Sequence, residues 1–124
     1  MPRLLVADDD PQQLGLRKLL LESSGHTVDV ALCVSETLRR AEQGRADLVI
    51  IDLRFPNAAG EPDAAEGLAL IRGIRALGCC VPVIVLSGWP EDLYGQPEEG
   101  MVSLIMVKPV GVATLLEAIH DLLR

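Results

Sequence analysis

Apolar positions along the chain fall into short blocks separated by longer segments in which apolar and polar residues mix. Most of the short blocks are rich in Val, Ile and Leu, which is typical of parallel strands covered on both faces. The five blocks are Arg3–Ala7, Thr27–Ala31, Asp47–Leu53, Val81–Leu86 and Ser103–Val107. The longer segments between them predict helices. This alternation predicts a doubly wound α/β fold with a five-stranded parallel sheet and right-handed crossovers.

The helical segments carry boundary signals. Asp10 and Pro11 predict an N-cap and a first helical position, and Gly25 predicts the end of that helix. Further helices are predicted from Ser35 to Glu42 and from Val112 to Leu123. Leucines at roughly helical spacing in the first helix are Leu14, Leu16, Leu19, Leu20 and Leu21. Inward residues of the last helix are Leu115, Leu116, Ile119, Leu122 and Leu123.

Two connections are predicted to be irregular. Residues 55–67, FPNAAGEPDAAEG, are rich in Pro, Gly and Ala, so we expect a long loop and a third helix that begins only after Gly67 and ends near Gly78. The segment Trp89–Gly100 contains two prolines and two glycines, which oppose helix interiors. We expect a short or irregular helix there.

Composition limits the classes of function. A chain of 124 residues, 49% of them apolar, fits one folded domain spanning 1–124. A net charge of −7 argues against direct binding of nucleic acid, which needs a basic face. No apolar run is long enough for a bilayer span, and the N-terminal segment does not resemble a signal peptide, so we expect a cytoplasmic protein without a membrane partner. Cys33, Cys79 and Cys80 lack zinc-site spacing and are expected to be reduced thiols.

Polar residues follow the apolar blocks at the points where the predicted strands end. They are Asp8 and Asp9 after the first strand, Asp52 in the third, Ser87 after the fourth and Lys108 after the fifth. Because ligands bind at the carboxyl ends of parallel strands, these side chains are expected to meet at one edge of the sheet.

Carboxylates placed together repel one another, and a hard divalent cation such as Mg²⁺ relieves that repulsion. Asp9 and Asp52 are the best candidate ligands, the backbone carbonyl of Arg54 is a third, and Asp8 is expected to act through a water or to orient its neighbour. Asp52 is also a candidate nucleophile toward a phosphoryl donor. Lys108 would neutralise charge on the transferring group, and the Ser87 hydroxyl would donate to a phosphoryl oxygen.

Four motifs, VADDDP, IIDLRFP, VLSG and MVKP, resemble those of receiver domains of two-component response regulators, in particular chemotaxis-regulator-like receivers. The resemblance spans essentially the whole chain. It implies a flavodoxin-like sheet of order 2-1-3-4-5, with Asp8 and Asp9 as the acid pair and Asp52 as the phosphorylation site. It further implies that Ser87 is the switch hydroxyl, that Lys108 pairs with the phosphate, and that the peptide bond before Pro109 is cis.

The resemblance also implies a function. Such a domain accepts a phosphoryl group in the presence of Mg²⁺ from a sensor histidine kinase or a phosphotransfer protein. The conformation around its fourth and fifth strands then shifts and regulates a downstream output protein or domain. Phosphorylation and dephosphorylation are self-catalysed, so we do not expect a turnover enzyme.

Some positions depart from the family's pattern or stay open. The loop after Asp52 is longer than usual, which indicates an insertion, and Ile105 replaces the usual aromatic switch residue of the fifth strand. Arg54 lies two residues beyond Asp52 and would modulate the site by an ion pair or by screening, unless it is simply exposed. Trp89, two residues beyond Ser87, would shield the acyl phosphate, mark a contact surface or form a local lid.

Two other classes of function are compatible with part of this pattern. Haloacid-dehalogenase-type phosphatases also use an aspartyl nucleophile, Mg²⁺ and a lysine, but they need a second aspartate where this chain has Arg54. The other alternative is a receiver-fold interaction module that phosphorylation does not regulate. The complete set of acid pair, acceptor, hydroxyl and lysine argues against that module, whereas the irregular segment Trp89–Gly100 mildly favours it.

Overall fold

A computed structural model describes residues 2–124 and contains a five-stranded parallel sheet of order β2-β1-β3-β6-β7. The strands are β1 (Arg3–Ala7), β2 (Thr27–Ala31), β3 (Leu48–Ile51), β6 (Val83–Ser87) and β7 (Leu104–Val107). In chain order of these strands the arrangement is 2-1-3-4-5, so the predicted fold class is confirmed. The bounds of the last three strands differ from the prediction by one or two residues at their ends.

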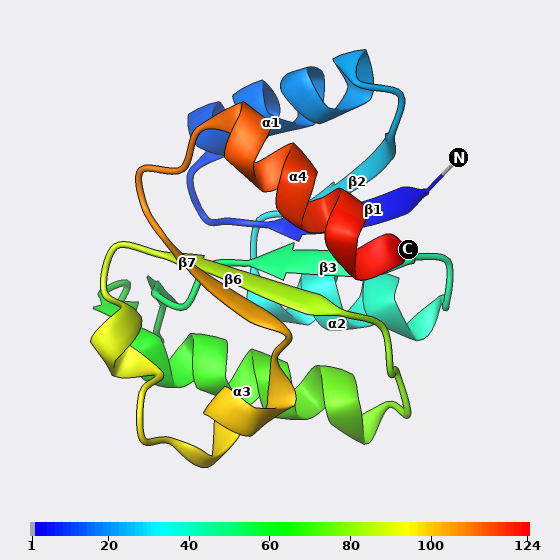
Figure 1. Cartoon of the computed structure of the whole chain (residues 1–124). Helices are drawn as coiled ribbons and strands as arrows, with labels where there is room; N and C mark the ends of the chain where they lie inside the picture. Colours follow the sequence, from blue (N-terminus) through cyan, green and yellow to red (C-terminus); the bar gives the residue numbers. More distant parts are fainter. Residues whose placement is uncertain (1) are drawn as a thin grey trace.

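Helices cover both faces of the sheet (Figure 1). α1 (Pro11–Ser23) and α4 (Val112–Leu123) lie on one face, and α2 (Val34–Glu42) and α3 (Ala64–Ala76) lie on the other. α1 begins as predicted, because the Asp10 carboxylate accepts a hydrogen bond from Gln12 N at 3.0 Å and Pro11 occupies the first turn. α4 has the predicted bounds.

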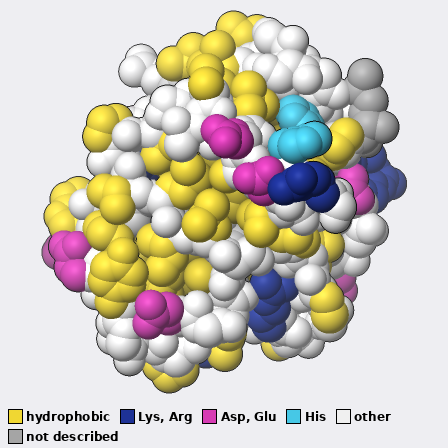
Figure 2. All heavy atoms as spheres, viewed as in Figure 1, with side chains coloured by type: hydrophobic (Ala, Val, Ile, Leu, Met, Phe, Trp, Pro, Cys, Tyr) yellow, Lys and Arg dark blue, Asp and Glu magenta, His cyan; other side chains and the backbone are white. Residues whose placement is uncertain are grey.

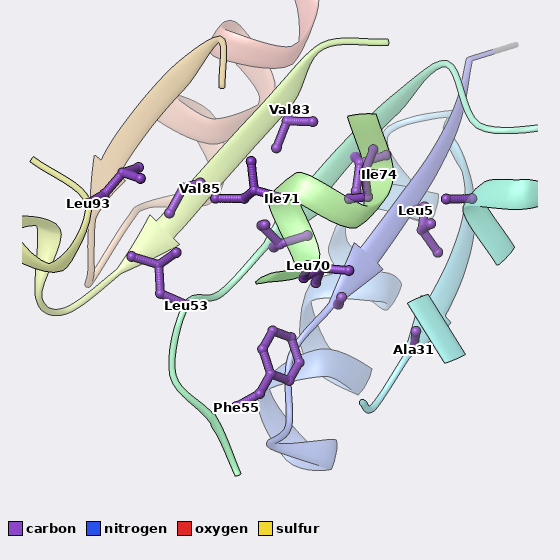
Figure 3. Packing of buried hydrophobic residues seen from close by; sticks show 14 residues of the cluster. Leu5, Ala31, Leu53, Phe55, Leu70, Ile71, Ile74, Val83, Val85 and Leu93 are labelled. Carbon is purple, nitrogen blue, oxygen red and sulfur yellow. The ribbon is translucent and has the colours of Figure 1, made fainter. Parts of the chain in front are cut away.

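The core consists of two apolar clusters, one on each side of the sheet. Side chains of β1 alternate between them: Leu4 and Val6 face α1 and α4, whereas Leu5 and Ala7 face α2 and α3. Figure 3 shows the second cluster, in which Phe55, Leu70, Ile71 and Ile74 are at most 1% exposed. Each fully buried side chain of this size contributes about 1.5–3 kcal/mol, so both faces hold the sheet in place.

Only part of the leucine set in α1 reaches the core. Leu14 and Leu21 lie seven residues apart on the same side of the helix and are buried, whereas Leu16 and Leu19 are 58% and 61% exposed. A helix packed on a sheet buries only one stripe of its surface, which accounts for this division. The other leucines therefore form an apolar outer surface on α1.

The start of α3 differs from the prediction. The helix begins at Ala64 rather than after Gly67, because the Asp63 carboxylate caps it by accepting a hydrogen bond from Ala65 N at 2.9 Å. Gly67 lies within the helix and faces the backbone of Leu53, so closely that an added Cβ would overlap it. The glycine therefore permits close approach of helix and strand end.

The loop after Asp52 is an ordered hairpin. β4 (Phe55–Pro56) and β5 (Pro62–Asp63) pair in antiparallel fashion. At the tip, the Asn57 side-chain oxygen accepts hydrogen bonds from Ala59 N at 2.9 Å and Glu61 N at 3.1 Å, and Gly60 has φ +79°. The predicted loop thus has its own local structure, and α3 follows it directly.

The connection between β6 and β7 is irregular, as predicted. It contains two 3-10 turns, η1 (Pro90–Asp92) and η2 (Pro97–Met101). Two arginines of α3 hold the second turn: Arg72 Nη1 lies 2.6 Å from Glu98 Oε2, and Arg75 donates to the Met101 carbonyl at 2.8 and 3.0 Å. Side-chain hydrogen bonds therefore replace much of the backbone order that a regular helix would supply.

β7 forms an edge of the sheet and is only partly covered. Leu104 and Val107 are 36% and 52% exposed, and Figure 2 shows apolar side chains in a band across the middle of this face. Within residues 2–124, no helix combines the length and apolar character needed to cross a membrane.

Candidate functional site

The carboxyl ends of four strands bring the predicted polar residues to one edge of the sheet. Asp8 and Asp9 follow β1, Asp52 follows β3, Ser87 ends β6 and Lys108 follows β7. One carboxylate oxygen from each of the three aspartates lies within 4.8 Å of the others. The sequence-predicted site is thus assembled by the topology of the sheet.

Lys108 joins two of these carboxylates. Its Nζ donates to Asp8 Oδ2 at 3.1 Å and to Asp52 Oδ2 at 3.0 Å. Its backbone N donates to the Ser87 carbonyl at 2.9 Å, which continues the pairing of β6 and β7. The Lys108–Pro109 peptide bond is cis. The ammonium therefore places positive charge against one oxygen of Asp8 and one of Asp52.

Asp8 is the most enclosed acid of the site, at 2% exposure. Burial opposes its ionisation, but the hydrogen bond from Asp10 N at 3.0 Å and the charge of Lys108 outweigh burial, so the pKa of Asp8 lies below its ordinary value. Arg17 Nη1 adds a contact at 3.5 Å. Asp8 is therefore a fixed anion that orients its neighbours.

Asp9 has the opposite electrostatic environment. Partial burial and then the negative charge of Asp8 raise the pKa of Asp9 above its ordinary value, and Asp52 adds to this effect. A divalent cation between these acids would relieve the repulsion. The three carboxylates offer the hard oxygen ligands that Mg²⁺ prefers, so the residues present fit that ion.

Asp52 presents its two oxygens differently. Oδ1 accepts a hydrogen bond from Leu53 N at 2.6 Å, whereas Oδ2 lies against the Lys108 ammonium. These two contacts hold the side chain, and its 15% exposure leaves it accessible to a reactant. This arrangement suits a carboxylate nucleophile beside a cation.

Ser87 is fully buried, and its hydroxyl oxygen accepts a hydrogen bond from Trp89 N at 3.0 Å. A hydroxyl that accepts in this way keeps its proton for donation to another oxygen. Ile105, the predicted switch position, lies in β7 and packs against the apolar cluster between the sheet and the helices α2 and α3.

The structure adds two residues that the sequence analysis missed, Arg17 and Asp92. Arg17 contacts Asp8 from α1, and Asp92 binds the Arg54 guanidinium at 2.8 and 3.3 Å. Helical phase could have placed Arg17 on the side of α1 that faces the strand end. No sequence signal marks Asp92, since it lies in the irregular segment.

An apolar groove lies beside the site, between α1 and the start of α4. Leu16, Leu20, Pro109 and Val112 line it, together with Lys108. Lys108 therefore belongs to both the groove and the carboxylate site, since it lines the groove and also contacts Asp52.

The site and fold can now be compared with known proteins. The family model for the response regulator receiver domain matches residues 4–120. The transcriptional regulatory protein PrrA of Mycobacterium leprae is 33% identical over 99% of this chain, and the chain spans 50% of PrrA's length.

Two solved structures are similar over nearly the whole chain. The response regulator TrrA of Thermotoga maritima, in complex with Mg(2+)-BeF, has a TM-score of 0.84 at 27% identity, and the match covers 98% of this chain and 99% of that one. The complex of histidine kinase ThkA with TrrA gives a TM-score of 0.83 at 27% identity, with full coverage of both chains. This chain belongs to the response regulator receiver domain family.

Proposed function

We propose that this domain accepts a phosphoryl group on Asp52 from a phosphohistidine of a sensor histidine kinase or phosphotransfer protein. An Asp52 oxygen attacks the phosphorus, the P–N bond breaks, and the imidazole leaves with the bonding electrons and takes up a proton. The product is an acyl phosphate. Attack of water on its phosphorus breaks the P–O bond and returns the Asp52 carboxylate and inorganic phosphate. The observation that carries the proposal is the Asp52 oxygen held 3.0 Å from Lys108 Nζ.

Mg²⁺ is the proposed cofactor. Asp9 and Asp52 would hold it directly, the carbonyl of Arg54 would be the third protein ligand, and Asp8 would act through a water or orient its neighbour. When bound, the ion neutralises charge on the transferring phosphoryl group. The clustered carboxylates support this proposal, as does the Mg(2+)-BeF bound to TrrA. Lys108 and the Ser87 hydroxyl would then bind the phosphoryl oxygens.

The proposed partners are a sensor histidine kinase or phosphotransfer protein and a downstream protein or domain, and the proposed location of this domain is the cytoplasm. The groove between α1 and α4 supports a docked donor, because a partner seated there would lie beside Asp52. The ThkA–TrrA complex supports the class of donor. We further propose that the domain itself does not bind nucleic acid, since its net charge is −7. Output would follow a shift in the region of β6 and β7.

The test is an intact-mass measurement after incubation with Mg²⁺ and acetyl phosphate or phosphoramidate. A phosphoryl adduct is expected in the wild type and in Asp121→Asn, a control on the exposed side of α4, but not in Asp52→Asn. An adduct that survives Asp52→Asn would assign another acceptor.

Absence of any adduct would favour an interaction module that phosphorylation does not regulate. The domain is also not expected to hydrolyse small phosphate esters repeatedly, because Arg54 stands where a phosphatase of the haloacid-dehalogenase type needs its second aspartate. Release of inorganic phosphate from such esters, followed over many turnovers, measures this.

A further inference from the structure

Arg54 connects the acceptor strand to the irregular segment between β6 and β7. Its Nε lies 2.8 Å from Asp92 Oδ2 and its Nη2 lies 3.3 Å from Asp92 Oδ1, so the carboxylate binds the guanidinium with both oxygens. The guanidinium carbon lies 3.9 Å above the centre of the Trp89 ring. These three side chains, Arg54, Trp89 and Asp92, are called the arginine clamp below.

The negative charge of Asp52 also acts on the Arg54 guanidinium. Arg54 follows Asp52 by two residues. The hydrogen bond to Asp92 is the largest cause that raises the pKa of Arg54 above its ordinary value, and the charges of Glu91 and Asp52 contribute in the same direction. Three acids therefore attract one cation, and Asp92 is the one that contacts it. In the structure Asp92 holds Arg54, and Asp52 is neutralised by Lys108 instead.

Phosphorylation changes this balance. A phosphoryl group carries more negative charge than a carboxylate and offers three oxygens that accept strong, often paired hydrogen bonds from arginine. Arg54 would then gain a second anionic partner two residues away along the chain. Asp92 binds the guanidinium through Nε and Nη2, and the Trp89 ring lies against its plane, so Arg54 can turn toward the new partner only if the ion pair with Asp92 loosens.

We propose that Asp92 competes with the phosphoryl group on Asp52 for Arg54, and that phosphorylation opens the arginine clamp. Asp92 is then a positioning residue: it holds Arg54 away from the acyl phosphate and, through Arg54, limits the stability of the phosphorylated state. The inference rests on the proposed function and specifies how that site is regulated.

Opening of the arginine clamp would change the conformation of η1, which with its N-cap carries two of the clamp's three residues. Asp92 and Trp89 both belong to this short turn or its N-cap, and Trp89 N also bonds the Ser87 hydroxyl. Two contacts thus tie η1 to the site, and the phosphoryl group would disturb both. Ile105 has no aromatic ring to relay a signal through β7, so the clamp offers a different route from the site to the exposed face.

The experiment measures binding of the phosphoryl analogue beryllofluoride with Mg²⁺ by isothermal titration calorimetry. Asp92→Asn removes the competing charge and should bind the analogue about fivefold more tightly or better, as expected for a coupling of about 1 kcal/mol or more. The control is Glu61→Gln, which removes an exposed negative charge that is not among the acids acting on Arg54. It should bind like the wild type. Asp92→Glu keeps the competing carboxylate and should also resemble the wild type.

A second readout follows the clamp itself. Trp89 is the single tryptophan of the chain, so its fluorescence reports the stacking with Arg54. Addition of Mg²⁺ and beryllofluoride should change the emission of the wild type, and Arg54→Lys should lose most of this change because lysine lacks the planar fork.

The outcomes are distinguishable. Unchanged analogue affinity in Asp92→Asn, or an equal gain in Glu61→Gln, would overturn the competition while leaving phosphoryl acceptance intact. Circular dichroism establishes that each variant is folded, and if Asp92→Asn is not folded, an unchanged wild-type emission overturns the proposal by itself. Failure of the folded wild type to bind the analogue or to form an adduct on Asp52 would instead overturn the proposed function.

Discussion

At the scale of single residues, Gly67 controls how closely α3 approaches the strand end that carries Asp52. An added Cβ would overlap the backbone of Leu53, which cannot move aside without moving β3. We expect Gly67→Ala to lower the free energy of unfolding by about 1–3 kcal/mol, the usual cost of overpacking, despite the better helix propensity of alanine. Urea denaturation measures this change.

The matched control is Gly15→Ala. Gly15 also lies inside a helix, but a Cβ there would meet nothing within 4 Å. Its replacement should stabilise the protein by about 0.5–1 kcal/mol. Equal effects of the two substitutions would contradict the close approach of Gly67 to Leu53.

The residues of the candidate site were predictable because the ends of the strands were predictable. Asp9, Asp52 and Lys108 lie at or just beyond the ends of apolar blocks, and a parallel sheet brings the carboxyl ends of its strands together. The partner of Arg54 was not predictable. Asp92 is 38 positions away in an irregular turn, and only the tertiary fold brings the two side chains together.

At the scale of elements, the two arginines of α3 determine where η2 lies. Arg72 pairs with Glu98, which is 4% exposed, and Arg75 donates to the carbonyls of Met101, Cys79 and Val81. A segment with two prolines and two glycines has little intrinsic helical order. Its position therefore depends on these side-chain contacts more than on its own backbone.

This dependence should appear as a pH effect. The hydrogen bond from Arg72 holds the pKa of Glu98 below its ordinary value, so the folded state favours the ionised acid. The stabilisation is present above the unfolded pKa of Glu98, about 4.3, and is lost as pH falls through the lower folded value. Between pH 6 and pH 3.5, the wild type should lose more unfolding free energy than Glu98→Gln, as measured by urea denaturation at each pH.

Glu117→Gln serves as the control for loss of one carboxylate, because Glu117 is exposed on α4. It should keep the acid sensitivity of the wild type. If Glu98→Gln also keeps it, the ion pair with Arg72 does not contribute to the acid response.

Most elements were predictable from periodicity and capping residues, but the start of α3 was not. The sequence PDAAEG combines turn-forming and helix-forming residues, and glycine opposes a helix on propensity alone. The cap at Asp63 and the contact of Gly67 with Leu53 outweigh that propensity. Tertiary packing, which is not visible in local sequence, decided this boundary.

At the scale of the whole molecule, the net charge is −7, and three of the acids, Asp8, Asp9 and Asp52, lie together at one edge of the sheet. Mg²⁺ bound there should stabilise the fold as a whole, since the unfolded chain cannot hold the three carboxylates together. At about 100 times its dissociation constant, the ion should add about 2.7 kcal/mol to the free energy of unfolding. A thermal melt with and without Mg²⁺, at matched ionic strength, measures this.

Asp9→Asn separates the specific site from general screening. Burial and the charge of Asp8 disfavour ionised Asp9, so the variant should be at least as stable as the wild type without metal. It should lose most of the stabilisation by Mg²⁺. An equal rise in Tm for the variant and the wild type would place the ion elsewhere.

The doubly wound parallel sheet followed from general rules, whereas the order of its strands was implied by the resemblance to receiver domains. Near-continuous apolar strands imply coverage on both faces, and right-handed crossovers leave few arrangements of five strands. The exposure of β7 was harder to predict from sequence. It depends on the edge position of the strand and on the irregular connection that contains η1 and η2.

The hairpin between β4 and β5 makes this receiver a convenient carrier for a reporter. Asn57 closes the hairpin tip, and Ala58 and Ala59 there are exposed. α3 is fixed to the end of β3 through Gly67 and Leu53, so extra residues at the tip need not displace Asp52. A small tag inserted between the two alanines would extend from the loop that follows the acceptor strand and lies outside the lining of the groove between α1 and α4.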